Sequence, residues 1–297
     1  MECRYRWVCK WVLNRVPRNT ARALSFGKLL HLVFEDHALS GDGMDVVITR
    51  QKAKYMASAD VVKMDVLEVQ SAVTAIEDLT SYTEVLCQWR DQYPFDIPVL
   101  EAETPFVTTS PYDKTIEFIG RPDRVGVIFG RLFHVQNRGL AQGTNFDLYL
   151  RLAKRHLHEL VYGYALSEKY RTSPNGGYAY GGTLFNLLRK IQYRGKPTKA
   201  NPEGKILRPL GECLWQGMVN FSEQELMSGM QRATQWAQSM RQTEQQFRID
   251  GRFPLPNERL NAGAYGNVLD PYFEVLQGDI KLDDDRYFKD REDTYRN

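Results

Sequence analysis

The spacing of apolar residues changes along the chain from a helical period to an alternating one. Residues 25–39 (SFGKLLHLVFEDHAL) place apolar side chains at helical spacing, and Ser25 fits an N-cap. After the break SGDGMD, residues 61–89 predict one long helix or two helices, which end before Pro94 and Pro98.

From residue 99 the pattern indicates strands. The segments 99–109 (VLEAETPFVTT) and 115–128 (TIEFIGRPDRVGVI) are strand-like runs. A turn at FGRL leads into 132–138 (LFHVQNR), where apolar and polar positions alternate. Three strands are therefore expected in succession, the last two as a hairpin.

Helices are expected again after this hairpin. Residues 144–170 predict one amphipathic helix capped by Thr144 or Asn145. RTSPNGGYAYGG follows as a loop, and residues 183–194 (TLFNLLRKIQYR) fit a strand or a short helix. Residues 222–247 predict a helix whose Ser222 and Glu225 form a capping box. This order predicts an α/β core: a small mixed sheet flanked by helices, with helical additions.

Length and composition bound the class of protein. At 297 residues we expect a single domain over 1–297, with its core at about 26–194, a C-terminal helical extension at 195–278 and an acidic tail at 279–297. No apolar run approaches the roughly 20 residues that span a bilayer, so no membrane partner is expected. The four cysteines are scattered, without a CxxC pair, which favours a reducing cytoplasm.

Charge is unevenly distributed although the net charge is only +2. Residues 1–35 and 186–208 are strongly basic, and the second block contains Arg189, Lys190 and Arg194. The last residues are acidic. Basic blocks on a near-neutral protein indicate either a polyanion partner or a solvated surface, and charge alone does not separate the two.

Polar residues in the strand region form a candidate site. Strand alternation puts Gln136 and Arg138 on one face together with His134, while Asp123 on the preceding strand approaches Gln136. These residues also have an interpretation without a functional role. Asp123, which follows Pro122, would be a turn residue, and Gln136 to Arg138 would form a polar strand end.

Two helices add further polar residues to this candidate site. His31 and Glu35 are four residues apart and share a helix face, as do His158 and Tyr162. These residues also have an alternative interpretation without a functional role. His31 would then be an ordinary helix histidine with its hydrogen bonds satisfied, and His158 and Tyr162 would lie on an ordinary helix surface.

Taken in order, these motifs resemble the RecB-like branch of the PD-(D/E)XK nucleases, which includes CRISPR-associated exonucleases. The family histidine falls on His31 in FGKLLH and the family aspartate on Asp123 in GRPD. The (D/E)-x-K pair falls on Gln136 and Arg138, and Q-x3-Y falls on His158 and Tyr162. The resemblance covers roughly residues 26–194.

The resemblance implies a restriction-endonuclease-like core and a metal-dependent reaction. Mg²⁺ or Mn²⁺ would be held by Asp123, Gln136 and His31, with Glu103 as an additional carboxylate. Arg138 would contact the scissile phosphate, and Tyr162 would complete the catalytic set. The strand would be held by a basic group that the resemblance and the charge pattern suggest: His158, Arg189, Lys190 and Arg194.

The sequence departs from the family pattern in two ways that bear on activity. Gln136 brings no charge to a metal, and Arg138 stays protonated, so it cannot act as a general base. The three C-terminal cysteines of the family's iron–sulfur members are also missing, although Cys3 or Cys9 could fill the N-terminal place. Around Tyr272 the matching positions hold Asn267, Asp270 and Leu276, so no iron–sulfur cluster is expected.

We therefore expect a Mg²⁺-dependent DNA nuclease of a bacterial or phage-infected cytoplasm. It would act on single strands or ends in recombination, repair or phage DNA processing, with possible protein partners in such a complex. The alternatives are a catalytically decayed nucleic-acid-binding protein on the same fold, and an assembly subunit that uses the long helices and acidic tail.

Overall fold

The structure is a computed structural model that describes residues 13, 15–17, 22–57, 66–83, 86–87, 98–140, 144–171, 177–189, 213–252 and 288–290. The chain separates into two compact units. The first, called here the sheet unit, comprises Phe26–Ser58 and Ala75–Thr234. The second comprises Met1–Ser25, Ala59–Thr74 and Gln235–Asn297. The expectation of a single domain stays a prediction.

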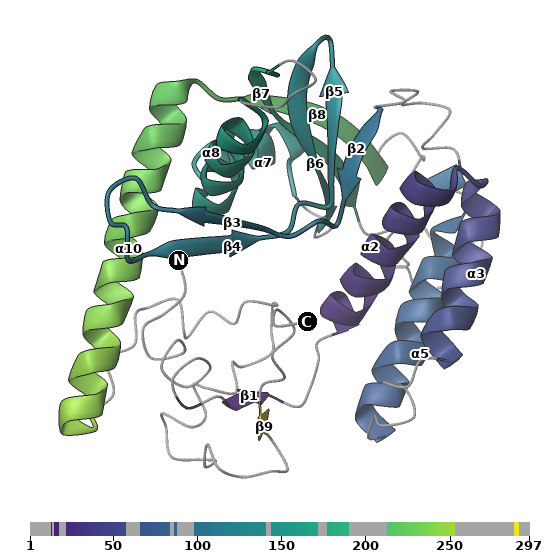
Figure 1. Ribbon diagram of the computed structural model, residues 1–297. Helices are drawn as coiled ribbons and strands as arrows, with labels where there is room; N and C mark the ends of the chain where they lie inside the picture. Colours follow the sequence, from purple (N-terminus) through teal and green to yellow (C-terminus); the bar gives the residue numbers. More distant parts are fainter. Residues whose placement is uncertain are drawn as a thin grey trace. The chain divides into compact units, whose positions relative to one another are not determined.

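A five-stranded mixed sheet forms the centre of the sheet unit (Figure 1). Only the central pair β6–β7 is parallel, and all other neighbouring strands are antiparallel. The α/β class expected from the sequence is therefore confirmed. In spatial order the strands are β2 (Val99–Ala102), β5 (Arg124–Ile128), β6 (Arg131–Leu140), β7 (Tyr180–Arg189) and β8 (Leu214–Asn220).

Two helices make the crossover that the parallel pair requires. α7 (Phe146–Ala153) and α8 (Leu157–Arg171) connect β6 to β7 and bury Phe146, Leu160 and Leu166 in the main apolar core. Asn145 caps α7 as expected, because its side chain accepts a hydrogen bond from the Leu148 N–H at 2.9 Å. The single helix expected over 144–170 is wrong: the chain breaks between the two helices at residues 154–156.

The strand runs 99–109 and 115–128 are each divided between two sheets. β3 (Phe106–Thr109) and β4 (Glu117–Gly120) form a separate two-stranded ribbon, while β2 and β5 belong to the main sheet. The ribbon packs its Phe106 ring against Tyr162 of α8, with ring centroids 5.1 Å apart. Gly120 permits this packing, since an added Cβ would lie 2.5 Å from the Tyr162 ring. The chain passes from β2 to β3 at residues 103–105 and from β4 to β5 at residues 121–123. These two short segments contain the candidate site residues Glu103 and Asp123.

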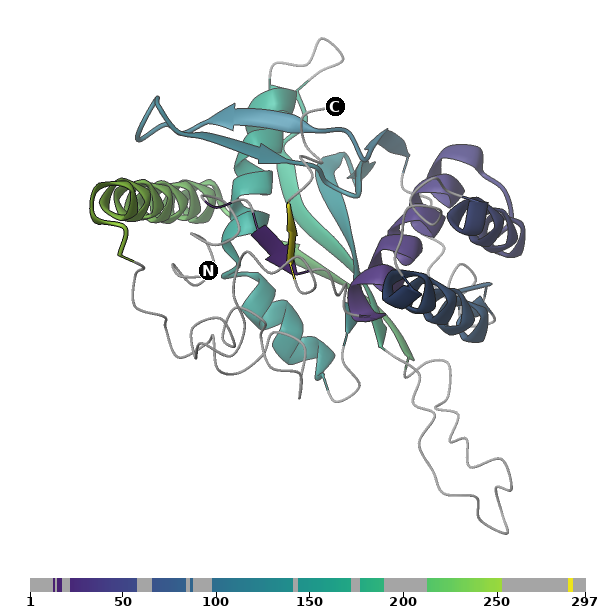
Figure 2. The ribbon, with the colours of Figure 1, turned by 90° about the horizontal axis from the view of Figure 1, so that it is seen from below.

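A group of helices flanks the sheet beside β2 and β5 (Figure 2). α2 (Arg22–Ser40) begins earlier than expected, so Ser25 is not its N-cap. α3 (Met44–Ala57), which the sequence pattern did not predict, buries Val47 and Ile48. The Arg50 guanidinium on α3 joins both helices by donating to the Asp36 carboxylate at 2.8 Å. α5 (Val66–Ser81) lies within the predicted long helix.

The C-terminal part of the sheet unit contains β8 and the first half of α10 (Glu223–Asp250). The capping box is confirmed: the Ser222 N–H donates to Glu225 at 2.8 Å, and the Glu225 N–H donates to Ser222 Oγ at 3.2 Å. For residues 183–189, β7 resolves the choice between strand and helix in favour of a strand, and residues 190–194 lie outside the described residues. β8 was not predicted.

The second unit contains a short antiparallel pair, β1 (Arg15–Pro17) with β9 (Phe288–Asp290). Among the helices that the structure describes, none combines the length and apolar character required to cross a membrane.

Candidate functional site

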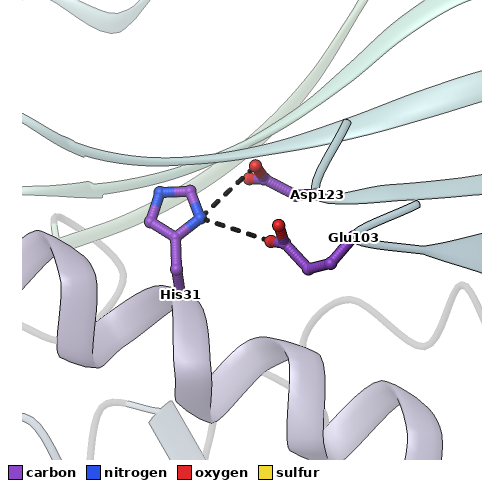
Figure 3. Close-up of side chains that lie close together, drawn as sticks. All are labelled: His31, Glu103 and Asp123. Carbon is purple, nitrogen blue, oxygen red and sulfur yellow. Dashed lines mark ion pairs between the residues drawn. The ribbon is translucent and has the colours of Figure 1, made fainter. Parts of the chain in front are cut away.

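A histidine and two carboxylates from three separate elements meet beside the main sheet (Figure 3). His31 comes from α2, Glu103 follows the last residue of β2, and Asp123 precedes the first residue of β5. His31 Nδ1 lies 3.3 Å from Asp123 Oδ1 and 3.9 Å from Glu103 Oε1. One potential ligand atom from each residue lies within 4.8 Å of the others. We call these three residues the acid–histidine cluster.

The register of the sheet explains why the two carboxylates meet. Ala102 of β2 is paired with Arg124 of β5, and Arg124 is paired with Val135 of β6. The next position along each of these strands is Glu103, Asp123 and Gln136, so three oxygen-bearing side chains occupy one row across three adjacent strands. The sequence predicts that Asp123 lies near Gln136 across a hairpin. The register of the sheet adds Glu103 to the same row.

Backbone and side-chain contacts hold the two carboxylates in place. The Glu103 N–H donates to the Asp123 carbonyl at 3.2 Å, and the Asn137 N–H donates to Asp123 Oδ2 at 2.7 Å. Arg121 Nε lies 3.0 Å from Glu103 Oε2. Glu103 also has a φ of +50°, a left-handed conformation that costs a non-glycine residue about 1–3 kcal/mol and is typical of functional sites.

The cluster is partly buried, and its charges interact strongly. Burial disfavours a charged imidazole, but hydrogen bonding to Asp123 and Glu103 and the charge of Asp123 outweigh it and raise the pKa of His31 to about 9. Without a metal, the cluster is therefore an ion pair between imidazolium and carboxylates at neutral pH. Glu35, one turn after His31, has a raised pKa because of burial and the neighbouring Glu103 charge.

Gln136 lies in this row but is sealed from solvent. Its side chain is 1% exposed, and its Oε1 has no hydrogen-bond partner among the described residues. Buried polar atoms without a partner are rare, and the capacity to bind an ion is one of the ordinary explanations. An amide oxygen is an acceptable ligand for Mg²⁺ or Mn²⁺.

Arg138 lies two positions further along β6 and meets α8. Its Nη2 is 3.3 Å from His158 Nε2, and its charge lowers the pKa of His31 in opposition to the carboxylates. His134, on the same face of β6, is hydrogen-bonded to Glu159 of α8. Phe133 and Val135 belong to a small apolar cluster with Ile128 and Leu184. This agrees with the expectation that their side chains point to the face of β6 opposite His134 and Gln136.

Tyr162 connects α8 to the segment that carries Asp123. Its Oη accepts a hydrogen bond from the Arg121 N–H at 3.1 Å and donates to the Arg121 carbonyl at 3.2 Å. The same Arg121 pairs with Glu103 through its side chain. Tyr162 therefore positions the loop of the carboxylates rather than lying among the potential metal ligands.

The acid–histidine cluster borders a small pocket between α2 and the sheet. Its lining includes Phe34, Glu35, Asp123, Asn137 and Asn186. An amide row forms part of this wall, because Asn186 Nδ2 donates to Asn137 Oδ1 at 2.9 Å and Asn186 Oδ1 accepts from Gln216 Nε2 at 2.9 Å.

The basic residues expected to hold a nucleic acid are only partly described. Arg189 packs its guanidinium 4.2 Å from the centre of the Phe146 ring and donates to the Thr144 carbonyl at 2.7 Å. Lys190 and Arg194 lie outside the described residues, as do the aligned positions Asn267, Asp270 and Leu276. The structure brings His31, Glu103 and Asp123 together, and places Arg138 beside His158.

Sequence reasoning missed the buried Glu159. Its carboxylate is fully buried beneath His158 and accepts hydrogen bonds from His134 and Thr183. Burial disfavours its charge, but the bonds and charges of His134 and His158 hold its pKa well below the usual range. A signal was present: Glu159 shares a helix face with Gly163, Leu166 and Tyr170, where an acidic residue interrupts a buried stripe.

Comparisons with known proteins do not identify a family. No model of a known protein family matches the chain, and no curated protein matches it.

Proposed function

We propose that this chain is a divalent-metal-dependent DNA nuclease of the PD-(D/E)XK type, acting on single strands or ends. The observation that carries the proposal is that potential ligand atoms of His31, Glu103 and Asp123 lie within 4.8 Å of one another. Glu103 and Asp123 belong to the same row across the sheet as Gln136. The order of His31, Asp123 and Gln136 along the chain matches the order of the RecB-like motifs.

The donor set fits a hard divalent cation. Asp123 and Glu103 supply carboxylate oxygens, Gln136 a buried amide oxygen without a partner, and His31 one imidazole nitrogen. The nitrogen makes this set softer than the all-oxygen set that Mg²⁺ prefers, so Mn²⁺ is expected to bind more tightly than Mg²⁺. Binding requires His31 to lose its proton, because an imidazolium has no lone pair to donate at Nδ1.

The remaining residues support phosphodiester cleavage by charge and position. A bound divalent ion supplies an activated water and neutralises the attacked phosphate. Arg138 stays protonated and stabilises the charge that develops on the phosphate, but it cannot remove a proton from water. Glu35, whose pKa is raised by burial and by Glu103, is the candidate to accept that proton.

The experiment is a digestion assay on end-labelled single-stranded DNA with Mg²⁺, with Mn²⁺ and with EDTA. Wild-type protein is expected to cut in either metal, more strongly in Mn²⁺, and Asp123→Asn is expected to lose cleavage. Asp147→Asn is the matched control, because Asp147 is an exposed aspartate in the first turn of α7. Equal cutting by the wild type and Asp123→Asn would identify a contaminant and reject the proposal.

A second candidate function is a nucleic-acid-binding protein without catalysis. The observation that favours it is the substitution of a neutral Gln136 and a permanently charged Arg138 for the family's acid and lysine. In that case the chain binds single-stranded DNA in EDTA, with affinity that falls steeply with salt, and no metal supports cleavage.

A further inference from the structure

An exposed tryptophan lies on β8, the last strand of the main sheet. Trp215 is 37% exposed, although tryptophan is highly buried on average in folded proteins. Among the residues that the structure describes, no strand pairs with the outer side of β8. A single exposed apolar residue needs no special explanation, so the surroundings of Trp215 decide whether it has a role.

Neighbouring side chains hold the indole ring in one orientation. The ring stacks on Phe146 of α7, with centroids 5.5 Å apart and planes inclined by 23°. Gly217 leaves room beside it, since an added Cβ there would lie 3.3 Å from Trp215 Nε1 and would also collide with Leu150 of α7. A ring that is already fixed loses little conformational freedom when a flat ligand stacks on it.

The ring that supports Trp215 is fixed in turn by Arg189 of β7. Phe146 is buried, and the Arg189 guanidinium lies 4.2 Å from the centre of its ring. The same guanidinium donates to the Thr144 carbonyl at 2.7 Å. Arg189 therefore supports the aromatic stack, whereas the charge pattern of the sequence alone suggested a direct contact with nucleic acid.

The register of the sheet places Trp215 on the same face as Arg138. Arg138 of β6 is paired with Leu187 of β7, and Leu187 is paired with Trp215. Directly paired residues point to the same face of a sheet, and adjacent strands are about 4.8 Å apart. The backbones at Arg138 and Trp215 are therefore about 10 Å apart along one row, a distance that a few nucleotides of one DNA strand can span.

The sequence that precedes β8 carries a strong positive charge. Residues 186–208 are rich in lysine and arginine, and Glu203 is their single acidic residue. β8 itself contains no charged residue that would repel a polyanion. Basic residues that attract the phosphate backbone, together with aromatic rings on which bases stack, are the usual means of binding single strands without sequence preference.

We propose that Trp215 is a stacking platform for an unpaired nucleobase of DNA, with Phe146 and Arg189 as positioning residues that hold it. The inference rests on the proposed function and narrows its substrate. A base within a duplex is already stacked on its neighbours and must be flipped out before it offers a free face, so the platform selects single strands over duplex DNA. The contact is made to a base, and it is separate from the phosphate contact of Arg138.

The test compares binding of two fluorescent single strands of equal length in EDTA, one with all its bases and one in which abasic residues replace them. Wild-type protein is expected to bind the base-bearing strand about tenfold more tightly. Trp215→Ala is expected to lose this preference, and Trp215→Phe, which keeps an aromatic face, to retain most of it. Trp236→Ala is the matched control, because it removes another partly exposed tryptophan, on α10, and it is expected to keep the full preference.

The outcomes separate the platform from the proposed function. Equal affinity of the wild type for the two strands, or an undiminished preference in Trp215→Ala, would overturn the platform. Either result would leave the nuclease proposal standing, since phosphate binding and cleavage do not require a stacked base. A wild-type chain that neither binds nor cuts DNA would reject the proposed function and the platform together.

A measurement on the wild type covers the case that Trp215→Ala does not fold. In protein labelled with fluorotryptophan, the ¹⁹F resonance of Trp215 is identified by its absence from Trp215→Phe. The base-bearing strand is expected to shift this resonance, and the abasic strand to leave it in place. A Trp215 resonance that responds equally to both strands, or to neither, would show that no base stacks on the indole ring.

Discussion

At the scale of single residues, His31 makes the metal-free protein sensitive to alkaline pH. Its pKa is raised from 6.5 to about 9, so its contribution to folding is complete below pH 6.5 and is lost as the pH rises through 9. We expect the free energy of unfolding in EDTA to fall by about 1–2 kcal/mol over this range, less than the full shift implies because the side chain is one-third exposed. Urea unfolding at several pH values measures it.

His31→Gln is the control for this pH effect. The variant cannot gain or lose a proton at this position, so the fall between pH 6.5 and 9 must be smaller than in the wild type. An equal fall in both proteins would assign the effect to other groups and contradict the ion pair described here.

Tyr162 provides a second prediction at this scale. Tyr162→Phe removes the hydroxyl that accepts from the Arg121 N–H and donates to the Arg121 carbonyl, which costs about 1 kcal/mol of stability. Because Arg121 also holds Glu103, we expect Mn²⁺ affinity to fall about tenfold. Urea unfolding and Mn²⁺ titration measure the two effects, and an unchanged metal affinity would remove Tyr162 from the support of the site.

Residue-level reasoning from the sequence reached the common face of His134, Gln136 and Arg138, because alternation in a strand follows from backbone geometry. It named Glu103 as an additional metal ligand beside Asp123, but not the strand register that brings the two together, and it missed the burial of Glu159. Those depend on the order of strands and on which helix face meets the sheet, and neither is encoded in local spacing.

At the scale of elements, β7 depends on a glycine. Gly182 has a φ of +147°, and an added Cβ would lie 2.1 Å from the Val219 carbonyl oxygen of β8. Gly182→Ala is expected to cost about 3 kcal/mol or more through strain and loss of the β7–β8 pairing. Thermal or urea unfolding measures it.

Gly139→Ala is the matched control for Gly182→Ala. Gly139 is also in the main sheet, but nothing lies within 4 Å of an added Cβ there. Its effect is expected to stay within about 0.5 kcal/mol. Equal losses in the two variants would show that the close approach at Gly182 does not constrain β7.

The same scale shows why several elements were missed. The run 144–170 keeps its apolar spacing across the break, so the periodicity alone predicts one helix although residues 154–156 separate α7 from α8. The runs 99–109 and 115–128 remain strand-like across Glu103 and Asp123, where the chain leaves one sheet for another. Tertiary pairing decides these breaks, and the breaks are where the carboxylates of the site lie.

At the scale of the whole molecule, the central claim is that His31, Glu103 and Asp123 form a divalent-metal site. Short sequence motifs suggest the PD-(D/E)XK assignment, and their order along the chain does not show that these residues meet. The contact arises from α2 lying beside the ends of β2 and β5, which only the assembled sheet unit provides.

The most direct test is a titration of the metal-free wild type with Mn²⁺ at pH 7.5, followed by electron paramagnetic resonance of the free ion. We predict one Mn²⁺ bound per chain, affinity reduced by about tenfold or more in Glu103→Gln and Asp123→Asn, and unchanged affinity in Glu168→Gln. Failure of the wild type to bind Mn²⁺, or equal binding by Asp123→Asn, would contradict the metal site.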